Sequence, residues 1–180
     1  MNIITTSIEG VLIIEPRVFK DNRGFFMETY NQDKYQKSGI NRHFVQDNLS
    51  YSGCGTLRGL HFQSRHPQAK LVQVITGEIF DVAVDIRKDS PTFGKWTGVV
   101  LSDQNKRQMF IPEGFAHGFC VISETAHFSY KCSDFYAPDD DGGIIWSDPE
   151  IGIEWPVKNP VISEKDKHHP RLCELLPEQL

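Results

Sequence analysis

One stretch, LRGLHFQSRHPQAKLVQVITGEIFDVAVDI (residues 57–86), predicts most of the fold, because its apolar and polar residues largely alternate. A period of two residues is typical of β-strands that bury one face. The pattern predicts strands at residues 57–63, 71–75 and 79–86. Gly77 and Glu78, between the last two, are typical of a hairpin turn. A sheet is therefore expected here, and not a helix.

The same alternation continues on both sides of this stretch. Further strands are expected at residues 11–14, 24–30, 44–49, 96–101, 108–111, 116–122 and 127–133. One short helix is expected over the polar residues 31–38, because Gly39 suits a helix C-cap. About ten short strands separated by turn residues are typical of an all-β sandwich or barrel. Strands and helices do not alternate, which argues against a Rossmann-type sheet.

The chain changes character after Pro138. An acidic turn, a glycine pair and two tryptophans follow, at Asp139, Asp140, Asp141, Gly142, Gly143, Trp146 and Trp155. We expect an irregular segment from about residue 138 that packs on the barrel, with a short helix near residues 164–167. A chain of 180 residues can bury a core of its own, so a single domain over residues 1–180 is expected.

Charge and cysteine content exclude several classes of protein. The 19 Lys and Arg against 24 Asp and Glu give a net charge of -5, which argues against a sequence-independent nucleic-acid binder. No apolar run approaches the roughly 20 residues of a membrane helix, and the first residues lack the features of a secretion signal. The four cysteines have no close spacing, so reduced thiols in a cytoplasmic protein are expected.

Alternation along the strands predicts which side chains meet inside the barrel. If the apolar residues Val72, Phe119 and Phe128 point inward, four titratable residues join them: His61, Lys70, His117 and Tyr130. One face of residues 57–63 is expected to hold Leu57, Gly59, His61 and Gln63. In residues 79–86, Asp81 and Asp85 face away from the set Phe80, Val82, Val84 and Ile86. A lumen that mixes apolar and titratable residues is typical of a ligand pocket.

Two segments, residues 55–77 and 112–119, follow the pattern of the cupin barrel. A metal-binding cupin carries a second histidine and a glutamate where this chain has Gln63 and Lys70. Two histidines beside a lysine make a poor divalent-metal site, so no metal is expected. Proton transfer remains, with His61 as base, Tyr130 as acid and Lys70 beside an enolate oxygen. Histidines packed in the core are the alternative that the residues leave open.

Six motifs run through the chain in order: FKDNRGFF (19–26), VQDNLS (45–50), LRGLHFQ (57–63), KLV (70–72), IPEGFAHGF (111–119) and YKCSDFYAP (130–138). With them the chain resembles, over nearly its whole length, the dTDP-4-dehydrorhamnose 3,5-epimerase family of metal-free cupins. The resemblance implies a cupin-type jelly-roll barrel or sandwich with one or a few short peripheral helices.

The resemblance also implies an activity and a reaction centre. The family epimerises dTDP-4-dehydro-6-deoxy-D-glucose at C3 and C5, giving dTDP-4-dehydro-L-rhamnose for dTDP-L-rhamnose biosynthesis, without a metal or cofactor. Both carbons flank the C4 ketone, so their protons are acidic. His61 matches the family's base, Tyr130 its acid and Lys70 the residue near the C4 oxygen. Asp166 matches a carboxylate that orients the base; taken alone, it would be a solvated tail charge.

Ten further positions match substrate contacts of the family: Arg23, Glu28, Gln46, Asp47, Asn48, Arg58, His117, Tyr136, Asp141 and Lys165. The first two lie on a strand that crosses to the partner subunit in the family, which implies a homodimer with N-terminal strand exchange. Residues 46–48 match a nucleotide-contacting turn, Arg58 a diphosphate contact, and His117 a sugar contact. Tyr136 matches the residue that stacks on thymine, and Asp141 stands where the family usually has glutamate. Surface salt bridges and a packed aromatic are the alternatives for the arginines and Tyr136.

Three rival functions share these features. A related dTDP-4-keto-6-deoxysugar 3- or 5-epimerase or 3,4-ketoisomerase has the same scaffold and base. The pairing of His61 with Tyr130 favours inversion, which needs an acid opposite the base. A metal-dependent cupin oxygenase or isomerase is disfavoured by Gln63 and Lys70. A non-catalytic sugar- or nucleotide-binding module would bind the ligand without accelerating proton exchange.

Overall fold

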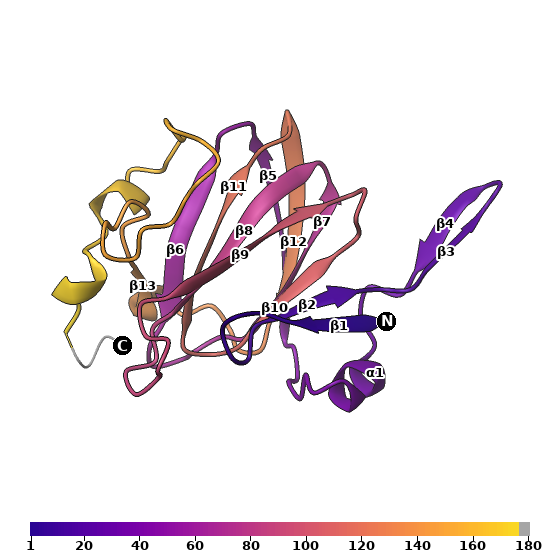
Figure 1. Cartoon of the computed structure of the whole chain (residues 1–180), viewed down its shortest axis with the longest axis horizontal. Coiled ribbons are helices and arrows are strands. Elements are labelled where there is room, and N and C mark those ends of the chain that lie inside the picture. The colour runs from indigo at the N-terminus through magenta and orange to yellow at the C-terminus, as the bar shows by residue number, and fades with distance from the viewer. Residues whose placement is uncertain (177–180) are drawn as a thin grey trace.

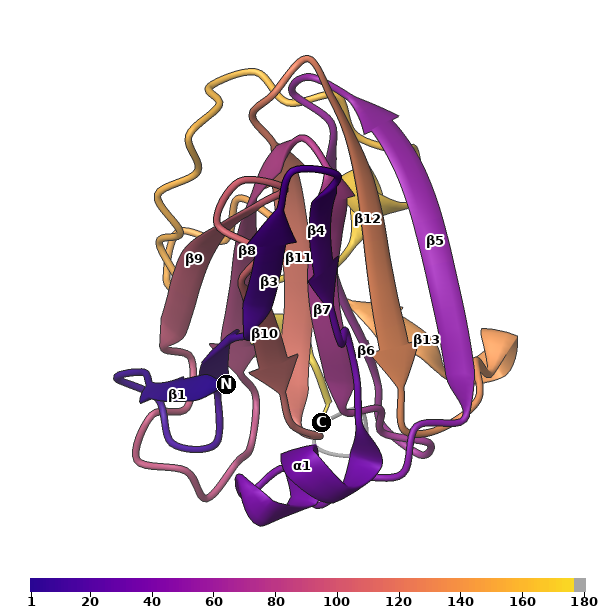
Figure 2. The same cartoon turned by 90° about the vertical axis from the view of Figure 1, so that its right-hand side faces the viewer.

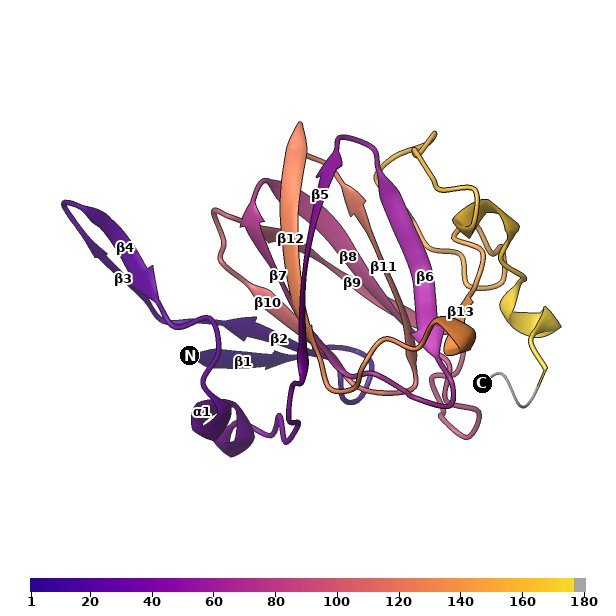
Figure 3. The same ribbon diagram turned by 180° about the vertical axis from the view of Figure 1, so that it is seen from behind.

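Two β-sheets packed face to face form the body of the molecule (Figures 1 and 3). The computed structural model describes residues 1–176. The larger sheet has the strand order β1-β2-β10-β7-β12-β5, and the smaller has the order β13-β6-β11-β8-β9. The strand pairs in both sheets are antiparallel. The predicted all-β jelly roll is therefore confirmed.

Ten of the thirteen strands within residues 1–176 lie where the sequence pattern predicts them, whereas the strands at residues 2–5, 18–21 and 141–143 were not predicted. The strands are β1 (Asn2–Thr5), β2 (Leu12–Glu15), β3 (Val18–Asp21), β4 (Gly24–Met27), β5 (Gln46–Gly53), β6 (Leu57–Gln63), β7 (Lys70–Thr76), β8 (Glu78–Asp85), β9 (Trp96–Ser102), β10 (Gln108–Ile111), β11 (Phe115–Val121), β12 (Thr125–Cys132) and β13 (Asp141–Gly143). The helices are α1 (Gln32–Lys37) and the 3-10 turns η1 (Pro138–Asp140), η2 (Asp166–His168) and η3 (Leu172–Glu174). No helix within residues 1–176 is long and apolar enough to cross a membrane.

Helix α1 forms where its capping residues predict it. The side chain of Asn31 accepts a hydrogen bond from the Lys34 N–H at the N-terminus of the helix. The last turn closes at Ser38, and Gly39 follows with a φ of 90°, a conformation that glycine adopts freely. The helix buries Tyr35 against the end of the larger sheet, where the tyrosine hydroxyl donates to Gln108 Oε1.

The predicted hairpin at Gly77 is wrong. Strand β7 pairs with β10 and β12 in the larger sheet, whereas β8 pairs with β11 and β9 in the smaller one. Gly77, with a φ of 86°, carries the chain from one sheet to the other, and a Cβ there would lie 2.0 Å from the carbonyl oxygen of Thr125. Strand β8 is covered on both faces. A strand buried in this way is more stable between two neighbouring strands of a sheet than in an isolated two-stranded hairpin.

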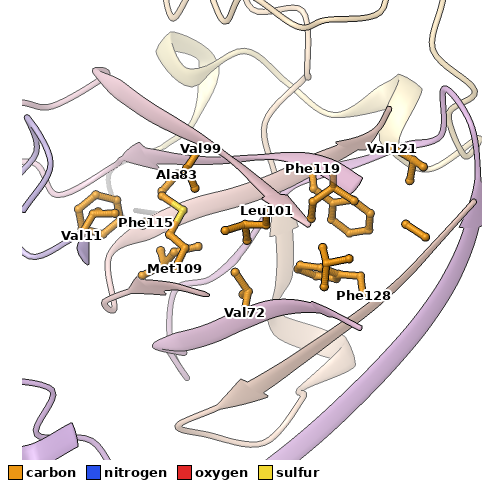
Figure 4. Packing of buried hydrophobic residues seen from close by; sticks show 14 of the residues in the cluster. Val11, Val72, Ala83, Val99, Leu101, Met109, Phe115, Phe119, Val121 and Phe128 are labelled. Atoms are coloured by element: carbon orange, nitrogen blue, oxygen red, sulfur yellow. The ribbon is translucent and has the colours of Figure 1, made fainter. Parts of the chain in front are cut away.

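The main core fills the space between the sheets. Figure 4 shows Val72 and Phe128 of the larger sheet facing Leu101 and Phe119 of the smaller one. The Phe119 and Phe128 rings have centroids 4.3 Å apart. The outer face of β8 is also apolar, and the C-terminal segment covers it with Ile144, Ile151 and Leu172. Both faces of β8 are therefore buried, including the face that carries Asp81 and Asp85.

The pairing of β6 with β11 contains an irregularity that corrects one strand-face prediction. His117 lies opposite His61, but Phe119 lies opposite Arg58, so three residues of β6 span two of β11. Residues directly opposite each other project on the same face of a sheet. Arg58 therefore shares the inner face with His61, and Leu57, which was expected there, pairs instead with Cys120.

Strands β3 and β4 form a separate two-stranded ribbon that projects away from the sandwich in Figure 1 and lies in front of it in the view of Figure 2. Its residues Phe19, Phe25 and Phe26 are 48%, 54% and 66% exposed. Isolated ribbons of two strands are marginally stable in water, and exposed clusters of large apolar side chains mark contact surfaces.

Candidate active site

A cavity of about 330 Å³ is lined by both sheets and by the loop after β12. The larger sheet contributes Gln46, Asn48, Lys70, Tyr130 and Cys132. The smaller sheet contributes His61, Phe62, Gln63 and Asp141. Gln68 and Tyr136 complete the lining. The volume is in the range of small-molecule sites, and polar groups converge on it from two walls.

Strand register explains why these side chains gather. On the larger sheet, Cys132 lies between Gln46 and Lys70 as their direct cross-strand partner. Tyr130, two residues before Cys132 on β12, lies between Asn48 and Val72 in the same way. On the smaller sheet, His61 pairs with Gly143, and Gln63 pairs with Asp141. Opposing residues on adjacent strands share a face, so each row projects into the cavity together.

His61 is held by Asp166, which reaches it from η2. His61 Nε2 and Asp166 Oδ1 are 2.9 Å apart, and Asp166 Oδ2 accepts the Gly59 N–H at 3.1 Å. Burial opposes ionisation of this carboxyl, yet the imidazoles of His169 and His61 and the Gly59 N–H hold the pKa of Asp166 below its ordinary value. An ionised carboxylate only accepts hydrogen bonds, so His61 Nε2 carries hydrogen and Nδ1 keeps its lone pair.

Lys70 and Tyr130 occupy the opposite wall. Within residues 1–176, no hydrogen bond or ion pair of the structure engages the Lys70 ammonium or the Tyr130 hydroxyl. Burial lowers the pKa of Lys70, a shift that Cys132, Asp81 and Asp141 partly oppose. Burial raises the pKa of Tyr130, so the phenol keeps its proton at neutral pH. The cavity thus has a basic nitrogen on one wall and a phenol and a cationic amine on the other.

Tyr136 is fixed at the mouth of the cavity by two glutamines and an aspartate. Its backbone N–H donates to Gln46 Oε1 at 2.9 Å, and its hydroxyl donates to Asp141 Oδ2 at 2.8 Å. Gln63 Oε1 accepts the N–H of the next residue, Ala137, at 2.9 Å. The Lys165 ammonium forms an ion pair with Asp141. The tyrosine side chain remains 52% exposed, which leaves its ring available to a ligand.

Seven of the predicted residues lie outside the cavity lining. Asp166 and Lys165 are two of them, and they contact the lining residues His61 and Asp141; five others remain. His117 is buried between the sheets, where its Nε2 lies 3.0 and 3.1 Å from the two Asp81 oxygens. Arg58 lies on the inner face and donates to Ser52 Oγ of β5. Asp47 is on the outer face of β5 with Lys131. Residues 46–48 lie in a strand, as the alternation predicts, and not in the turn that the family resemblance implies.

The other two are associated with the projecting ribbon. Arg23 lies in its turn, 85% exposed, and is paired with Asp21. Glu28 follows β4 and is paired with Lys34. Neither residue lines the cavity of its own chain.

His169 is the residue near the base that the sequence pattern did not reveal. Its Nε2 lies 3.6 Å from Asp166 Oδ1, and its ring lies edge-on to that of His61 at 5.8 Å. Donor atoms of His61, Asp166 and His169 all fall within 4.8 Å of one another, a composition that could hold a metal ion. The 2.9 Å hydrogen bond within this cluster and the amine of Lys70 in the same cavity favour an acid–base function. Contacts between residues more than 100 positions apart, such as His61–Asp166 and Gly59–Asp166, bring this segment to β6, so no local motif could have indicated it.

Comparisons with known proteins agree with the geometry. The family described as dTDP-4-dehydrorhamnose 3,5-epimerase matches residues 5–174. A protein of that name from Shigella flexneri is 60% identical over 168 residues, covering 92% of this chain and 93% of the relative. A crystal structure of the Legionella pneumophila 3,5-epimerase with dTDP-4-keto-L-rhamnose has a TM-score of 0.97 and 51% identity, covering 99% of this chain and 96% of that one. A dTDP-4-dehydrorhamnose 3-epimerase from Streptomyces niveus is 40% identical, covering 93% of this chain and 82% of the relative.

Proposed function

The chain belongs to the dTDP-4-dehydrorhamnose 3,5-epimerase family, and from this we propose how its own residues carry out the reaction. It is an isomerase that epimerises dTDP-4-dehydro-6-deoxy-D-glucose at C3 and C5 to dTDP-4-dehydro-L-rhamnose. Each inversion removes a proton next to the C4 ketone and returns one on the other side of the ring. The reaction therefore needs a base and an acid that face each other across the substrate.

The observation that carries the assignment is the position of His61 and Tyr130 on opposite sheets, lining one cavity. We assign proton removal to His61 Nδ1, because Nε2 is engaged by Asp166. As the imidazolium forms, the Asp166 carboxylate stabilises its charge. Tyr130 then donates its phenolic proton from the other wall. Lys70, next to Tyr130 in the larger sheet, stabilises the negative charge that develops on the C4 oxygen.

Nucleotide binding is assigned to the mouth of the cavity. The exposed ring of Tyr136 offers a stacking face to thymine, and Gln46 and Asn48 offer amides beside it. Arg58, on the inner face of β6, offers a guanidinium to the diphosphate. We propose sugar or nucleotide contacts for Asp47, His117, Asp141 and Lys165 as well. The last two already form an ion pair at the rim, so substrate would displace or extend that pair.

An exchange assay tests the reaction. The protein is incubated in D2O with dTDP-4-dehydro-6-deoxy-D-glucose, and deuterium is located by NMR. Incorporation at both C3 and C5 with inversion is expected. Incorporation at one carbon only would indicate a monoepimerase, movement of the ketone would indicate a ketoisomerase, and no incorporation would indicate a binding module.

We propose that the active form is a homodimer in which the β3–β4 ribbon reaches the partner subunit. Three exposed phenylalanines on a projecting ribbon support an interface there, and Arg23 and Glu28 lie beside them, away from their own cavity. Light scattering should give a dimer mass, and Phe26→Asp should lower it, whereas Phe93→Asp, at an exposed phenylalanine elsewhere, should not.

Co-expression tests whether residues are shared between subunits. Arg23→Ala and His61→Ala, each inactive alone, should together restore about a quarter of the activity, because half of the dimers are mixed and one of their two sites is intact. No recovery in verified mixed dimers would contradict the proposal that Arg23 serves the partner's site.

We also propose a cytoplasmic location and one cooperative folding unit. The structure has free cysteines, with Cys54 and Cys173 exposed, which suits a reducing compartment. The C-terminal segment completes the core over β8, which supports one unit over residues 1–180. Cell fractionation tests the first proposal, and a single calorimetric transition tests the second.

A further inference from the structure

Asp166 is shared between two imidazoles. The same oxygen, Oδ1, lies 2.9 Å from His61 Nε2 and 3.6 Å from His169 Nε2. The second distance is too long for a hydrogen bond, but it places a polar nitrogen directly against the carboxylate. The side chain of His169 is 9% exposed, and its Nε2 is buried with no hydrogen-bond partner among residues 1–176. A buried nitrogen without a partner is costly, so its presence calls for an explanation.

The fold holds the His169 ring in this position. A Cβ on Gly143 of β13 would lie 2.5 Å from both Cε1 and Nε2 of the ring, so the missing side chain at Gly143 makes room for it. Pro170 follows, which keeps the His169 backbone extended, and its carbonyl accepts the Ile145 N–H at 2.8 Å. Gly143 is also the cross-strand partner of His61. The two imidazoles and the glycine therefore form one packed unit.

We propose that His169 is a positioning residue that acts through Asp166 to limit how tightly His61 holds a proton. The proposal rests on the assignment of His61 as the base. A carboxylate facing His169 Nε2 favours the tautomer with hydrogen on that nitrogen. The N–H then draws on the charge of Asp166 Oδ1, which leaves less of it to stabilise the His61 imidazolium. If His169 itself gains a proton, repulsion between the two rings acts in the same direction.

The consequence for catalysis is a base that releases its proton readily. The second inversion, and every new turnover, needs His61 in the neutral form. If Asp166 interacted with His61 alone, it would strengthen proton uptake by His61 but slow the release of that proton. Sharing Asp166 between two rings balances the two steps near neutral pH, where general bases are most effective.

Most of the other charged groups near His169 are paired with partners of their own. A second cavity, of about 450 Å³, is lined by His169 together with the charged residues Arg65, Asp139, Asp140 and Asp141. Asp140 is bound by Arg65, and Asp141 is bound by Lys165. On the segment of His169 itself, Lys167 is paired with Glu164, and His168 Nδ1 contacts the Glu164 carbonyl. Asp166 is the charged group that lies against both His169 and His61.

Titration of His61 by NMR in the ligand-free protein tests the coupling without relying on activity. His169→Phe keeps an aromatic ring but removes Nε2, and the pKa of His61 should rise by about one unit, as expected when a neighbouring donor is lost. Gly143→Ala should give a shift of the same sign, because it displaces the ring without removing a titratable group. His169→Gln, whose amide can donate to Asp166, should restore most of the parent value.

The pH profile of kcat/KM then tests the use of this coupling. Its acidic limb should move upward in His169→Phe and Gly143→Ala and return in His169→Gln. An unchanged His61 pKa in folded His169→Phe and Gly143→Ala would overturn the proposal. A shift that vanishes when EDTA is added would overturn it in favour of metal binding. If the NMR shifts appear but the enzyme shows no exchange at C3 or C5, the assignment of function fails and the coupling stands.

Discussion

His61 and His117 are cross-strand partners on β6 and β11, yet each is paired with a different aspartate. His61 faces the cavity with its side chain 35% exposed, whereas His117 is 8% exposed and stacks on Phe128. Burial lowers the pKa of His117, and the Asp81 carboxylate opposes that shift. Of the two neighbouring imidazoles, His61 is therefore the one connected to solvent, whereas His117 is buried and paired with Asp81.

The first prediction concerns the base. His61→Ala should retain binding of dTDP but lose at least about 10²-fold in kcat, the typical contribution of a general base. His127→Ala is the matched control, because His127 lies on β12 away from the cavity and contacts Thr76 and Tyr51. Steady-state kinetics and calorimetric binding of dTDP measure the two effects. Equal losses of activity in both variants would contradict the assignment.

The second prediction separates the acid from the base. Tyr130→Phe removes only the hydroxyl, so His61 can still take a proton and return it to the same side. Epimerised product should fall by about 10²-fold, while deuterium exchange without inversion persists. Tyr51→Phe, at a tyrosine that is 59% exposed, should behave like the parent. Loss of exchange in parallel with inversion would mean that Tyr130 is needed for proton removal.

The third prediction concerns the alkaline limb of the pH profile. Burial lowers the pKa of Lys70 and raises that of Tyr130. Activity that depends on the ammonium should therefore fall at a lower pH than an ordinary lysine would cause. In Lys70→Gln the rate should be low and this limb should be absent. Persistence of the limb would assign it to another group.

The fourth prediction concerns nucleotide binding at the cavity mouth. Tyr136→Ala should raise KM about tenfold with little change in kcat, since base–aromatic stacking contributes about 1–3 kcal/mol. Gln63→Ala should have a smaller effect of the same kind, because it releases the loop at Ala137. Phe135→Ala changes the neighbouring exposed ring and serves as the control. A fall in kcat alone would move Tyr136 from binding to chemistry.

The fifth prediction concerns stability in acid. Burial opposes ionisation of Asp85, but hydrogen bonds from Arg87, Ser90 and Thr92 lower its pKa to about 2. A carboxyl group whose pKa is lower in the folded than in the unfolded chain stabilises the fold at pH values above its unfolded pKa. That stabilisation is lost as the pH falls from about 4 to about 2. Asp85→Asn should therefore lower the free energy of unfolding by about 2 kcal/mol at pH 7.

Urea denaturation at pH 7 and at pH 3 measures this difference. The difference in unfolding free energy between Asp85→Asn and the parent should be smaller at pH 3, because the unfolded parent chain then takes up a proton at Asp85 while the folded parent stays ionised there. Asp89→Asn, four residues along the same loop and with an exposed carboxyl, is the control. A gap that is independent of pH would show that packing, and not ionisation, is the main contribution of Asp85.

Sequence periodicity predicted the strands well, because burial on one or two faces leaves a local pattern. Strands β6 and β10 have the predicted bounds, and α1 lies within the predicted range. The turn at Gly77 was misassigned since a glycine with positive φ serves a hairpin and a crossover between sheets equally well. Which of the two occurs depends on β10 and β11, which are more than 30 residues away in the chain.

The candidate site was predictable to the extent that it depends on strand faces. His61, Lys70 and Tyr130 follow from alternation along β6, β7 and β12. Arg58 joins them only through the irregular pairing of β6 with β11, which alternation cannot indicate. Asp166 and His169 lie in an irregular segment, so their positions depend on long-range packing. The family resemblance identified Asp166 but not His169.

The long reach of Asp166 to His61 also has a consequence for the order of assembly. The contact spans 105 residues, and a parallel bridge between Thr56 and Val161 tethers the segment just before it. Long-range contacts are slow to form. A newly made chain can therefore complete both sheets, with Tyr136 in place, before its base gains a carboxylate. Such an incompletely folded chain would bind the nucleotide sugar without converting it. The onset of turnover would therefore report that the segment carrying Asp166 has packed onto β6.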